Sequence, residues 1–576
     1  MNSQIFQQGL FLGYISKVNV HRSVVHIPSS TYLNKFIHYG EEFQGGIINS
    51  YILVEGEDKG FVGKIVAAEI PEKERLELST ASLKSKDFHP LVQIEILSLF
   101  DYQNVDFEKS IIDFPNIGSK VYMASDKFIK RYLEEIELKS SEIKTKGFSK
   151  IISPNTNETI DISFQSLFSR HAAIVGTTGS GKSWTTASLV NNLLERKQPV
   201  LLLDATGEYK DVANKHCEEE YRVILGKSHV LSYRNLSIQS LFNLLTPAPN
   251  AQAPKLKEAI QSLKLLEVDN TNDELEGYID EDHLGIRTLQ KVGKDRNHFL
   301  RTLNGSIEEV SRDNCKFDIR GLGQQVQNEC VYPSAFPPNA HKFGGADGGS
   351  LGHCISLITR IETLISDSYY NKIFDFLNQT GSENDMIHVL NNFIESIKSG
   401  ENKRGYFLYI DVSNVPFAHR MREIVVDIIG QTLLNYSRED SFKEKPTTVF
   451  IDEAHQFLNK SVSVESDIQP LDSFENISKE GRKYGLFLCL TTQLPRDIPI
   501  GILSQVGTFI THRLINQRDK DIISHVLPSS NESIINYLPS LGQGEAIISS
   551  NELKDTLYIK VSEPQIAPIS ETPKYQ

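Results

Sequence analysis

The first hundred residues alternate apolar and polar positions in short runs. Six such runs occur, at 12–21, 23–29, 45–54, 60–70, 75–81 and 91–100. Gly, Ser, Asp or Pro residues separate them, and a period of two is typical of strands that bury one face. The pattern therefore predicts a small β-barrel over residues 1–105.

The alternation weakens over residues 106–159, where an amphipathic stretch at 125–138 predicts a helix within a connecting region. From residue 160 onward, continuous apolar runs alternate with helical segments. Such runs are typical of parallel strands buried on both faces. The core strands are predicted at 171–176, 199–204, 405–413, 447–454, 486–493 and 507–514, with a closing pair near 544–549 and 556–562.

The stretch 241–403 is too long for a single crossover connection. Apolar spacing at 253–267 and 356–377 predicts helices within it, because a structureless loop of that length is uncommon. The Gly-rich segment 344–350 predicts a flexible loop. We expect an inserted helical subdomain at 241–403, between core segments at 160–240 and 404–576.

The strongest chemical signal is GTTGSGKS at 176–183, which matches G-x-x-x-x-G-K-[ST] between a predicted strand and a predicted helix. The glycines let the backbone form a nest of N–H groups that holds phosphate oxygens. Lys182 would reach the β and γ phosphates of ATP, and Ser183 would ligate Mg²⁺. The alternative is a Gly-rich turn without a ligand. The residues predicted to contact the nucleotide are Gly176, Thr177, Thr178, Gly179, Ser180, Gly181, Lys182, Ser183 and Trp184.

A second signal, TVFIDEAHQFL at 448–458, ends an apolar strand in two carboxylates. Asp452 would hold Mg²⁺ through its water shell, and Glu453 would orient and polarise the attacking water. The letters DEAH also occur in DEAH-box helicases, but only about 120 residues follow Glu453, too few for their second motor domain. His455 would have a structural role, or would contact a neighbouring residue or the nucleotide.

Four further positions leave alternatives open. Gln493 follows a predicted strand and would sense the γ-phosphate or only cap the sheet. Arg482 would supply a guanidinium to the transition state, often of a neighbouring subunit, or lie on a solvated basic turn. Asp204 and Glu208 would serve catalysis or only neutralise nearby lysines.

Composition indicates a globular protein of two or three domains: 576 residues, 39% hydrophobic and 23% charged. No apolar run approaches about 18 residues and no secretory signal is evident, so a cytoplasmic location without membrane contact is expected. The five cysteines are scattered, which argues against a metal site. The net charge of −14 disfavours a surface that is basic throughout, although a narrow channel can still be basic.

The motifs described above, together with SRHAAIVG, LLLDATGEY, FLYIDVSNVP and GRKYGLFLCLTTQLP, resemble the HerA family of hexameric ATPases in the HerA–FtsK superfamily. The resemblance implies an α/β fold: a RecA-like P-loop ATPase core with a mainly parallel sheet, an N-terminal small β-barrel and an inserted helical subdomain. It also implies a homohexameric ring that translocates double-stranded DNA with ATP and Mg²⁺. A partner would dock on the barrel, and bacterial relatives work with a sirtuin-like or nuclease effector in anti-phage defence.

Carried over residue by residue, the family pattern makes Lys182 and Ser183 the phosphate-loop pair and Asp452 and Glu453 the catalytic carboxylates. Gln493 becomes the sensor, Arg482 the arginine finger, and Arg170 a second nucleotide-contacting arginine. The chain departs from the family at DATGEY, where relatives carry Pro-His before Gly-Glu. Two functions compete: a DNA-translocating motor, and a ring that scaffolds and regulates an effector. A secretion or conjugation motor would need a membrane anchor, which the sequence does not provide.

Overall fold

In the computed structural model, the chain folds into two compact units. The structure describes residues 5–19, 22–71, 88–103, 105–108, 113–137, 143–154, 156, 158–268, 272–399, 405–458, 471–527 and 532–569. The first unit comprises Met1–Lys197, Phe487–Arg496 and Leu503–Gln576, and the second Gln198–Leu486 and Asp497–Ile502. The chain therefore leaves the first unit after Lys197 and returns to it near its C-terminal end.

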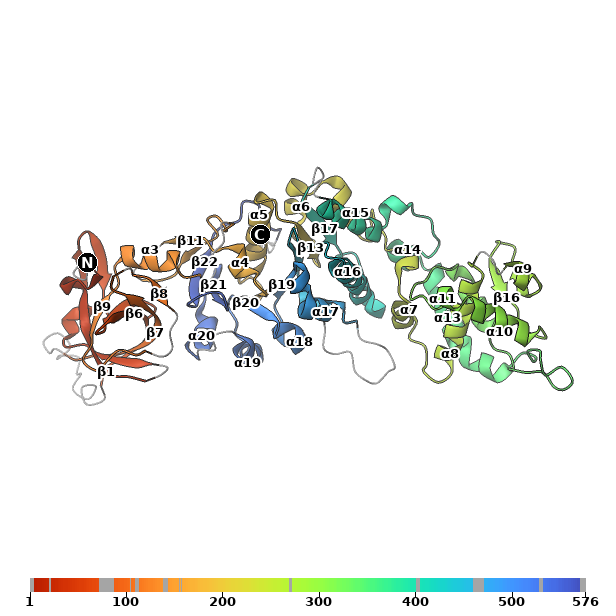
Figure 1. The fold of residues 1–576 in the computed structure, drawn as a ribbon, viewed down its shortest axis with the longest axis horizontal. Helices are drawn as coiled ribbons and strands as arrows, with labels where there is room; N and C mark the ends of the chain where they lie inside the picture. The colour runs from red at the N-terminus through yellow and green to blue at the C-terminus, as the bar shows by residue number, and fades with distance from the viewer. Residues whose placement is uncertain are drawn as a thin grey trace, which may run out of the picture. The chain divides into compact units, whose positions relative to one another are not determined.

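The N-terminal part of the first unit is a closed six-stranded β-barrel, drawn in red to orange in Figure 1. The strand order is β2-β1-β9-β5-β6-β7, and pairing of β2 with β7 closes the ring. The bounds are β1 Phe11–Lys17, β2 Ser23–His26, β5 Tyr51–Glu55, β6 Lys59–Glu69, β7 Leu91–Asp101 and β9 Lys120–Met123. Alternate residues point inward, so that Leu12, Ile52 and Val92 lie completely buried in one core.

The barrel uses more of the chain than its six predicted strands. β9 closes the ring although it lies in the range 106–159 that was expected to be a connection. A separate hairpin of β3 (Lys35–His38) and β4 (Glu41–Gln44) was not predicted, and β8 (Phe107–Glu108) extends β7. The predicted strand at 75–81 lies outside the described residues. The predicted helix is present as α3 (Asp126–Glu134), which the Ser125 side chain caps.

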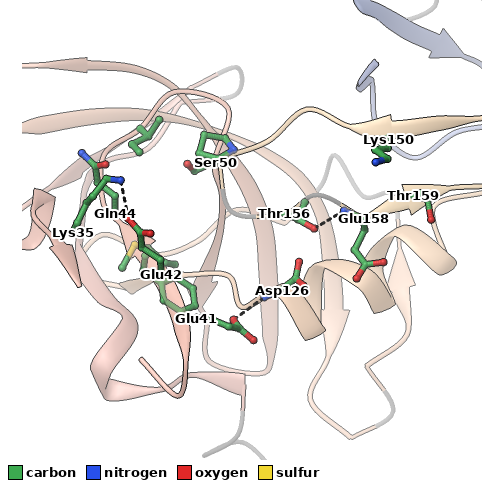
Figure 2. A pocket seen from close by; sticks show the side chains of 14 residues that line it. Lys35, Glu41, Glu42, Gln44, Ser50, Asp126, Lys150, Thr156, Glu158 and Thr159 are labelled. Carbon is green, nitrogen blue, oxygen red and sulfur yellow. Dashed lines mark hydrogen bonds and ion pairs between the residues drawn. The ribbon is translucent and has the colours of Figure 1, made fainter. Parts of the chain in front are cut away.

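A cavity lies beside the β3–β4 hairpin, within the first unit, and Figure 2 shows its lining. Glu41 and Glu42 come from the hairpin, Asp126 from the start of α3, and Glu158 from the segment before β11. Glu42 is paired with Lys35 at 2.7 Å. Lys150 also lines the cavity, so four acidic and two basic side chains surround it.

The remainder of the first unit contains a sheet with the order β11-β10-β22-β21-β20-β12-β19. Its central strand β12 is parallel to β19 and β20, whereas β21 and β22 add antiparallel strands at one side. The strands are β10 Ser149–Ile151, β11 Thr159–Ile160, β12 His171–Val175, β19 Leu486–Thr492, β20 Val506–Thr511, β21 Glu545–Ser550 and β22 Leu557–Val561. The helices are α4 Phe164–Leu167, α5 Lys182–Glu195, α19 Gln517–Val526 and α20 Glu532–Tyr537.

The second unit contains a parallel sheet with the order β18-β13-β17-β14. The strands are β13 Val200–Asp204, β14 Arg222–Ile224, β17 Phe407–Asp411 and β18 Thr447–Ile451. All residues of β13, β17 and β18 are buried, which explains their unbroken apolar sequences. The helices nearest to these strands in the chain are α6 Lys210–His216, α15 Met386–Lys398, α16 Met421–Arg438 and α17 Ser473–Glu480.

A mainly helical part lies between β14 and α15, and Figure 1 shows it in yellow and green. Its helices are α7 Ile238–Leu245, α8 Gln252–Leu265, α9 Asn272–Leu275, α10 Arg296–Gly305, α11 Ile307–Val310, α12 Leu322–Asn328, α13 Gly348–Ser366 and α14 Ser368–Phe374, with a small hairpin of β15 Ile279–Glu281 and β16 Arg287–Leu289. The predicted flexible loop at 344–350 is wrong in its second half. Asp347 accepts hydrogen bonds from the N–H groups of Gly349 and Ser350 and so starts α13 at Gly348.

The predicted α/β fold class is confirmed: a P-loop core with a mainly parallel sheet, an N-terminal barrel and an inserted helical part. Within the described part of the chain, no helix combines the length and the apolar character needed to cross a membrane.

Candidate active site

The phosphate loop joins β12 to α5 in the first unit. Gly179 and Gly181 have φ angles of +72° and +113°, which L-residues with a side chain rarely adopt. A Cβ atom on Gly181 would also lie 3.0 Å from the backbone of Gly544. The Lys182 ammonium is buried and donates to the carbonyl of Thr177 at 3.2 Å. The loop thus forms a backbone nest with one cation folded over it, a suitable cradle for phosphate groups.

Neighbouring strand ends hold the loop in place. The N–H of Thr177 donates to the carbonyl of Arg513, and the N–H of Gly544 donates to the carbonyl of Ser180, both at 2.9 Å. Gln493 directly follows β19, as predicted, and its Oε1 accepts a hydrogen bond from the Thr178 hydroxyl at 2.5 Å. The structure therefore brings Gln493 to the phosphate loop. Ser183 and Trp184 begin α5 and are half-buried.

His512, which was not predicted from the sequence, lies next to the phosphate loop and contacts Thr185 of α5. Its Nδ1 lies 2.9 Å from the carbonyl oxygen of Glu545, and its Nε2 lies 2.9 Å from the hydroxyl of Thr185. A carbonyl only accepts, so Nδ1 carries the proton and Nε2 accepts from Thr185. Burial, with a smaller contribution from the nearby Lys182, lowers the pKa of His512 to about 4. His512 is therefore neutral at pH 7.

We expect this histidine to make stability depend on pH. Between pH 6.5 and about 4 the unfolded chain binds a proton at this position that the folded chain does not bind, so stability falls as the pH drops through this window. From pH 7 to pH 5 the loss attributable to His512 is about 2 kcal/mol. The variant His512→Gln should lose less stability over the same interval, as measured by thermal unfolding at both pH values. Equal losses in the two proteins would contradict this assignment.

Asp204, at the end of β13 in the second unit, anchors the following turn. One carboxylate oxygen accepts from the N–H groups of Thr206 and Gly207, at 3.0 and 2.7 Å. The other accepts from the N–H of Tyr209 at 2.9 Å and from the Tyr409 hydroxyl at 2.8 Å. Burial and Asp204 both raise the pKa of Tyr409, so its hydroxyl remains a donor. Asp204 thus binds backbone and hydroxyl donors.

The turn held by Asp204 presents two hydroxyl groups to Asp452. The Tyr209 hydroxyl lies 3.4 Å from one Asp452 oxygen, and the Thr206 hydroxyl lies 3.5 Å from the other. Asp452 follows β18 and is only 3% exposed. A buried carboxylate among hydroxyl groups provides the hard oxygen ligands that Mg²⁺ prefers, so the residues present fit this metal.

Glu453 has an unusual backbone. Its φ angle is +44°, in the left-handed region, and β18 therefore ends at Ile451 rather than at the predicted 454. Such a conformation costs about 1–2 kcal/mol for a residue with a side chain and is frequent at active sites. The Glu453 carboxylate lies 3.3 Å from Nδ1 of His455. His455 thus touches the predicted catalytic carboxylate.

Two further buried charges lie in the second unit, one at a strand end and one on a helix, and neither was predicted from the sequence. Asp411 ends β17, is fully buried, and lies 3.6 Å from Nζ of Lys210. Arg422 on α16 is 6% exposed, and its Nη1 donates to Oε1 of Gln456 at 2.7 Å. An acidic residue that ends an apolar strand, as in FLYIDVS, is the signal that could have identified Asp411.

The two predicted arginines lie on different units. Arg170 immediately precedes β12 and is exposed, with its side chain lying over Gly507. Arg482 lies on the short turn Gly481–Tyr484 in the second unit and is also exposed. The phosphate loop and Gln493 belong to the first unit, whereas Asp452 and Glu453 belong to the second.

The phosphate loop between β12 and α5 defines the class of protein, a P-loop nucleotide-binding protein. The family model "Helicase HerA, central domain" matches residues 147–330, and "Helicase HerA-like C-terminal" matches residues 431–572. The matched ranges together cover more than half of the chain. The chain therefore belongs to the HerA family, as its motifs predicted, and is an ATPase.

Curated relatives agree with this assignment. A probable helicase of Methanocaldococcus jannaschii is 24% identical over 488 residues, covering 82% of this chain and 79% of the relative. A DNA double-strand break repair helicase HerA of Sulfolobus acidocaldarius is 24% identical over 452 residues, covering 78% and 73%. Among solved structures, VirB4 of Thermoanaerobacter pseudethanolicus has a TM-score of 0.42 at 13% identity, covering 72% of this chain and 96% of that one.

Proposed function

We propose that this chain is an ATP-driven motor that moves double-stranded DNA. The observation that carries the proposal is membership of a family whose named relatives are helicases of DNA double-strand break repair. The buried parallel strands with functional side chains at their ends support a motor that couples nucleotide chemistry to movement.

We assign the catalytic roles from the family's motifs. Lys182 and the loop amides would hold the ATP phosphates, and Ser183 and Asp452 would hold Mg²⁺. Bound Mg²⁺ neutralises charge on the phosphates. Glu453 would take up the proton of the attacking water, and Gln493, which already contacts Thr178, would respond to the γ-phosphate.

We propose a homohexamer in which an arginine of one subunit completes the site of its neighbour. Arg482 and Arg170 are both exposed, which supports a role across a subunit contact. We expect Arg482→Ala to lower the hydrolysis rate about 10³-fold or more without preventing nucleotide binding. Mixing Arg482→Ala subunits with Lys182→Ala subunits should restore part of the activity. At some subunit contacts, the first variant then provides an intact phosphate loop and the second provides the arginine. No recovery in any mixing ratio would contradict action across subunits.

Movement along DNA can be tested by displacement of a third strand. A duplex that carries a triplex-forming oligonucleotide is incubated with the protein, Mg²⁺ and ATP. We expect the third strand to be released with ATP but not with a non-hydrolysable analogue. Release that is equal with both nucleotides, or absent with both while hydrolysis proceeds, would contradict translocation.

We propose further that an effector protein, a nuclease or an NAD-consuming sirtuin-like enzyme, docks on the N-terminal barrel, in a system of anti-phage defence. The β3–β4 hairpin supports a docking role for the barrel. Ile37 is 77% exposed and Tyr39 is 92% exposed, and large apolar side chains with that exposure often mark protein interfaces. The acidic cavity beside the hairpin favours a partner with basic side chains at this place (Figure 2).

The hairpin predicts a separable defect. The double variant Ile37→Ala, Tyr39→Ala should weaken binding of the product of the adjacent gene about 10- to 100-fold, because two exposed anchors are truncated. ATP hydrolysis should stay within about twofold of wild type, and Leu284→Ala, at an exposed apolar position of the helical part, should change neither property. If the double variant binds this product as tightly as wild type does in biolayer interferometry, docking through the hairpin is contradicted.

The second candidate function, a scaffold that regulates an effector without translocation, is favoured by the same exposed hairpin. It predicts full effector activity in a ring that carries Glu453→Gln. The motor predicts that effector activity on DNA falls with the loss of hydrolysis. A nuclease or NAD-consumption assay of the complex therefore separates the two functions.

A further inference from the structure

The loop between β17 and α16, residues 412–420, has buried valines near its start and an exposed, backbone-strained tip at 417–419. Phe417 is 66% exposed, and His419 beside it is also exposed. His419 and Arg420 have φ angles of +52° and +56°, so two consecutive residues with side chains adopt the left-handed conformation. Each costs about 1–2 kcal/mol, and such strain persists only where surrounding contacts impose it.

Arg422 holds the part of the loop that precedes these two residues. Its Nε donates to the carbonyl of Val415 at 2.6 Å, and its Nη2 donates to the carbonyl of Ser413 at 3.0 Å. The guanidinium also lies 3.9 Å from the centre of the Phe417 ring, within cation–π distance. One buried side chain therefore fixes both the start and the exposed aromatic tip of the loop.

The same guanidinium fixes the turn that carries the catalytic carboxylate. Nη1 of Arg422 donates to Oε1 of Gln456 at 2.7 Å, and the N–H of Gln456 donates to the carbonyl of Glu453 at 2.8 Å. The five N–H groups of a guanidinium lie in one rigid plane. Arg422 thus connects the 412–420 loop to the turn of Glu453 through hydrogen bonds.

The charge and the aromatic side chain of the 412–420 loop favour binding of a polyanion. No acidic residue occurs between Asp411 and Glu423, although the whole chain has 74 acidic residues and a net charge of −14; Glu423 itself interacts electrostatically with Arg420. His419 and Arg420 lie beside the exposed Phe417, and the His419 ring lies 5.9 Å from the ring of Tyr370 on α14. Cations interleaved with aromatic rings bind nucleic acid through phosphate contacts and stacking.

We propose that residues 412–420 contact the DNA on which the motor acts, and that Arg422 is the positioning residue that links this contact to Glu453. The inference rests on the proposed function and assigns the part of the chain that performs it. DNA engages Phe417 and Arg420, the loop shifts, and Arg422 carries the shift through Gln456 to the catalytic turn. DNA therefore accelerates hydrolysis by acting on this loop.

The contact is tested with Phe417→Ala and Arg420→Ala, assayed for duplex binding at two salt concentrations and for ATP hydrolysis with and without duplex. We expect DNA affinity about tenfold weaker and a largely lost DNA response, measured as the ratio of the hydrolysis rates with and without duplex. Arg420→Ala should also reduce the salt slope of binding by about one. Phe336→Ala, at a position that is 91% exposed in the helical part, and Arg301→Ala, at an exposed position of α10, serve as matched controls and should behave as wild type.

The positioning role is tested with Arg422→Lys, which keeps the charge but loses the planar fork. We expect DNA affinity within about threefold of wild type together with loss of the acceleration by DNA. If Arg422→Lys lowers the rates with and without DNA by the same factor, its role is structural and the link is overturned.

The outcomes distinguish a failure of the loop assignment from a failure of the proposed motor function. If wild type responds to DNA and the Phe417 and Arg420 variants respond equally, the loop assignment is overturned while the motor stands. If these variants lower the mass of the assembly in solution, the loop is a subunit contact and the assignment is again overturned. If wild type neither binds nor responds to DNA, the proposed function fails and the inference fails with it.

Discussion

Lys182→Ala lowers the rate of ATP hydrolysis about 10²–10³-fold or more, because it removes the cation that stabilises the charge developing on the transferred phosphoryl group. The Lys182 ammonium is buried against the phosphate loop and bound to the Thr177 carbonyl, so no other described side chain occupies its place. Nucleotide affinity should fall as well, since the ground-state phosphates lose the same charge. Steady-state phosphate release and a fluorescent-nucleotide titration measure the two effects.

The matched control for Lys182 is Lys215→Ala, which removes an exposed lysine of α6. We expect its rate to remain within about twofold of wild type. Near-normal hydrolysis by Lys182→Ala, with a properly folded protein, would mean that the phosphate site is elsewhere.

Glu453→Gln lowers hydrolysis about 10²–10⁴-fold while leaving ATP affinity within about threefold of wild type. The physical reason is that the amide cannot take up the proton of the attacking water but has the same shape as the carboxylate. The left-handed backbone of Glu453 is imposed by the turn and should persist in the variant. The pair of measurements is single-turnover hydrolysis and equilibrium ATP binding.

Glu444→Gln, at an exposed position just before β18, is the matched control and should hydrolyse ATP as wild type does. If Glu453→Gln lost binding and hydrolysis to the same extent, Glu453 would serve ground-state binding and not activation of water.

The core strands could be predicted from the sequence to within a few residues, because the strands of the parallel sheets are buried on both faces and their apolar runs are unbroken. β13 and β18 show this directly, with all residues buried. The barrel was less predictable. β9 is only four residues long and follows a polar stretch, and the β3–β4 hairpin carries exposed side chains that blur its alternation.

The site was predictable where one short motif carries the chemistry and unpredictable where distant segments meet. Lys182, Asp452 and Glu453 stand in contiguous patterns. His512 meets Thr185, and Arg422 meets Gln456, only because the fold brings separate segments together. No local sequence pattern identifies His512 or Arg422. A buried histidine or arginine can be identified only from its hydrogen-bond partners, which are distant in the sequence.

Residues with a left-handed backbone show the same limit of prediction from sequence. A glycine at such a position is a readable signal, as at Gly179 and Gly181, but Glu453, His419 and Arg420 adopt it against their intrinsic preference. Tertiary contacts decide these conformations, and they coincide with the turn of the predicted catalytic carboxylate and with the loop proposed to contact DNA.

The central claim is that DNA drives the ATPase of this chain, and one titration tests it most directly: steady-state ATP hydrolysis by the wild-type protein against increasing duplex DNA at fixed Mg²⁺ and low salt. The account predicts a saturable rise in rate, whose midpoint shifts to higher DNA concentration as salt is raised, because phosphate contacts release counterions. A robust rate that stays unchanged across the whole titration would contradict it.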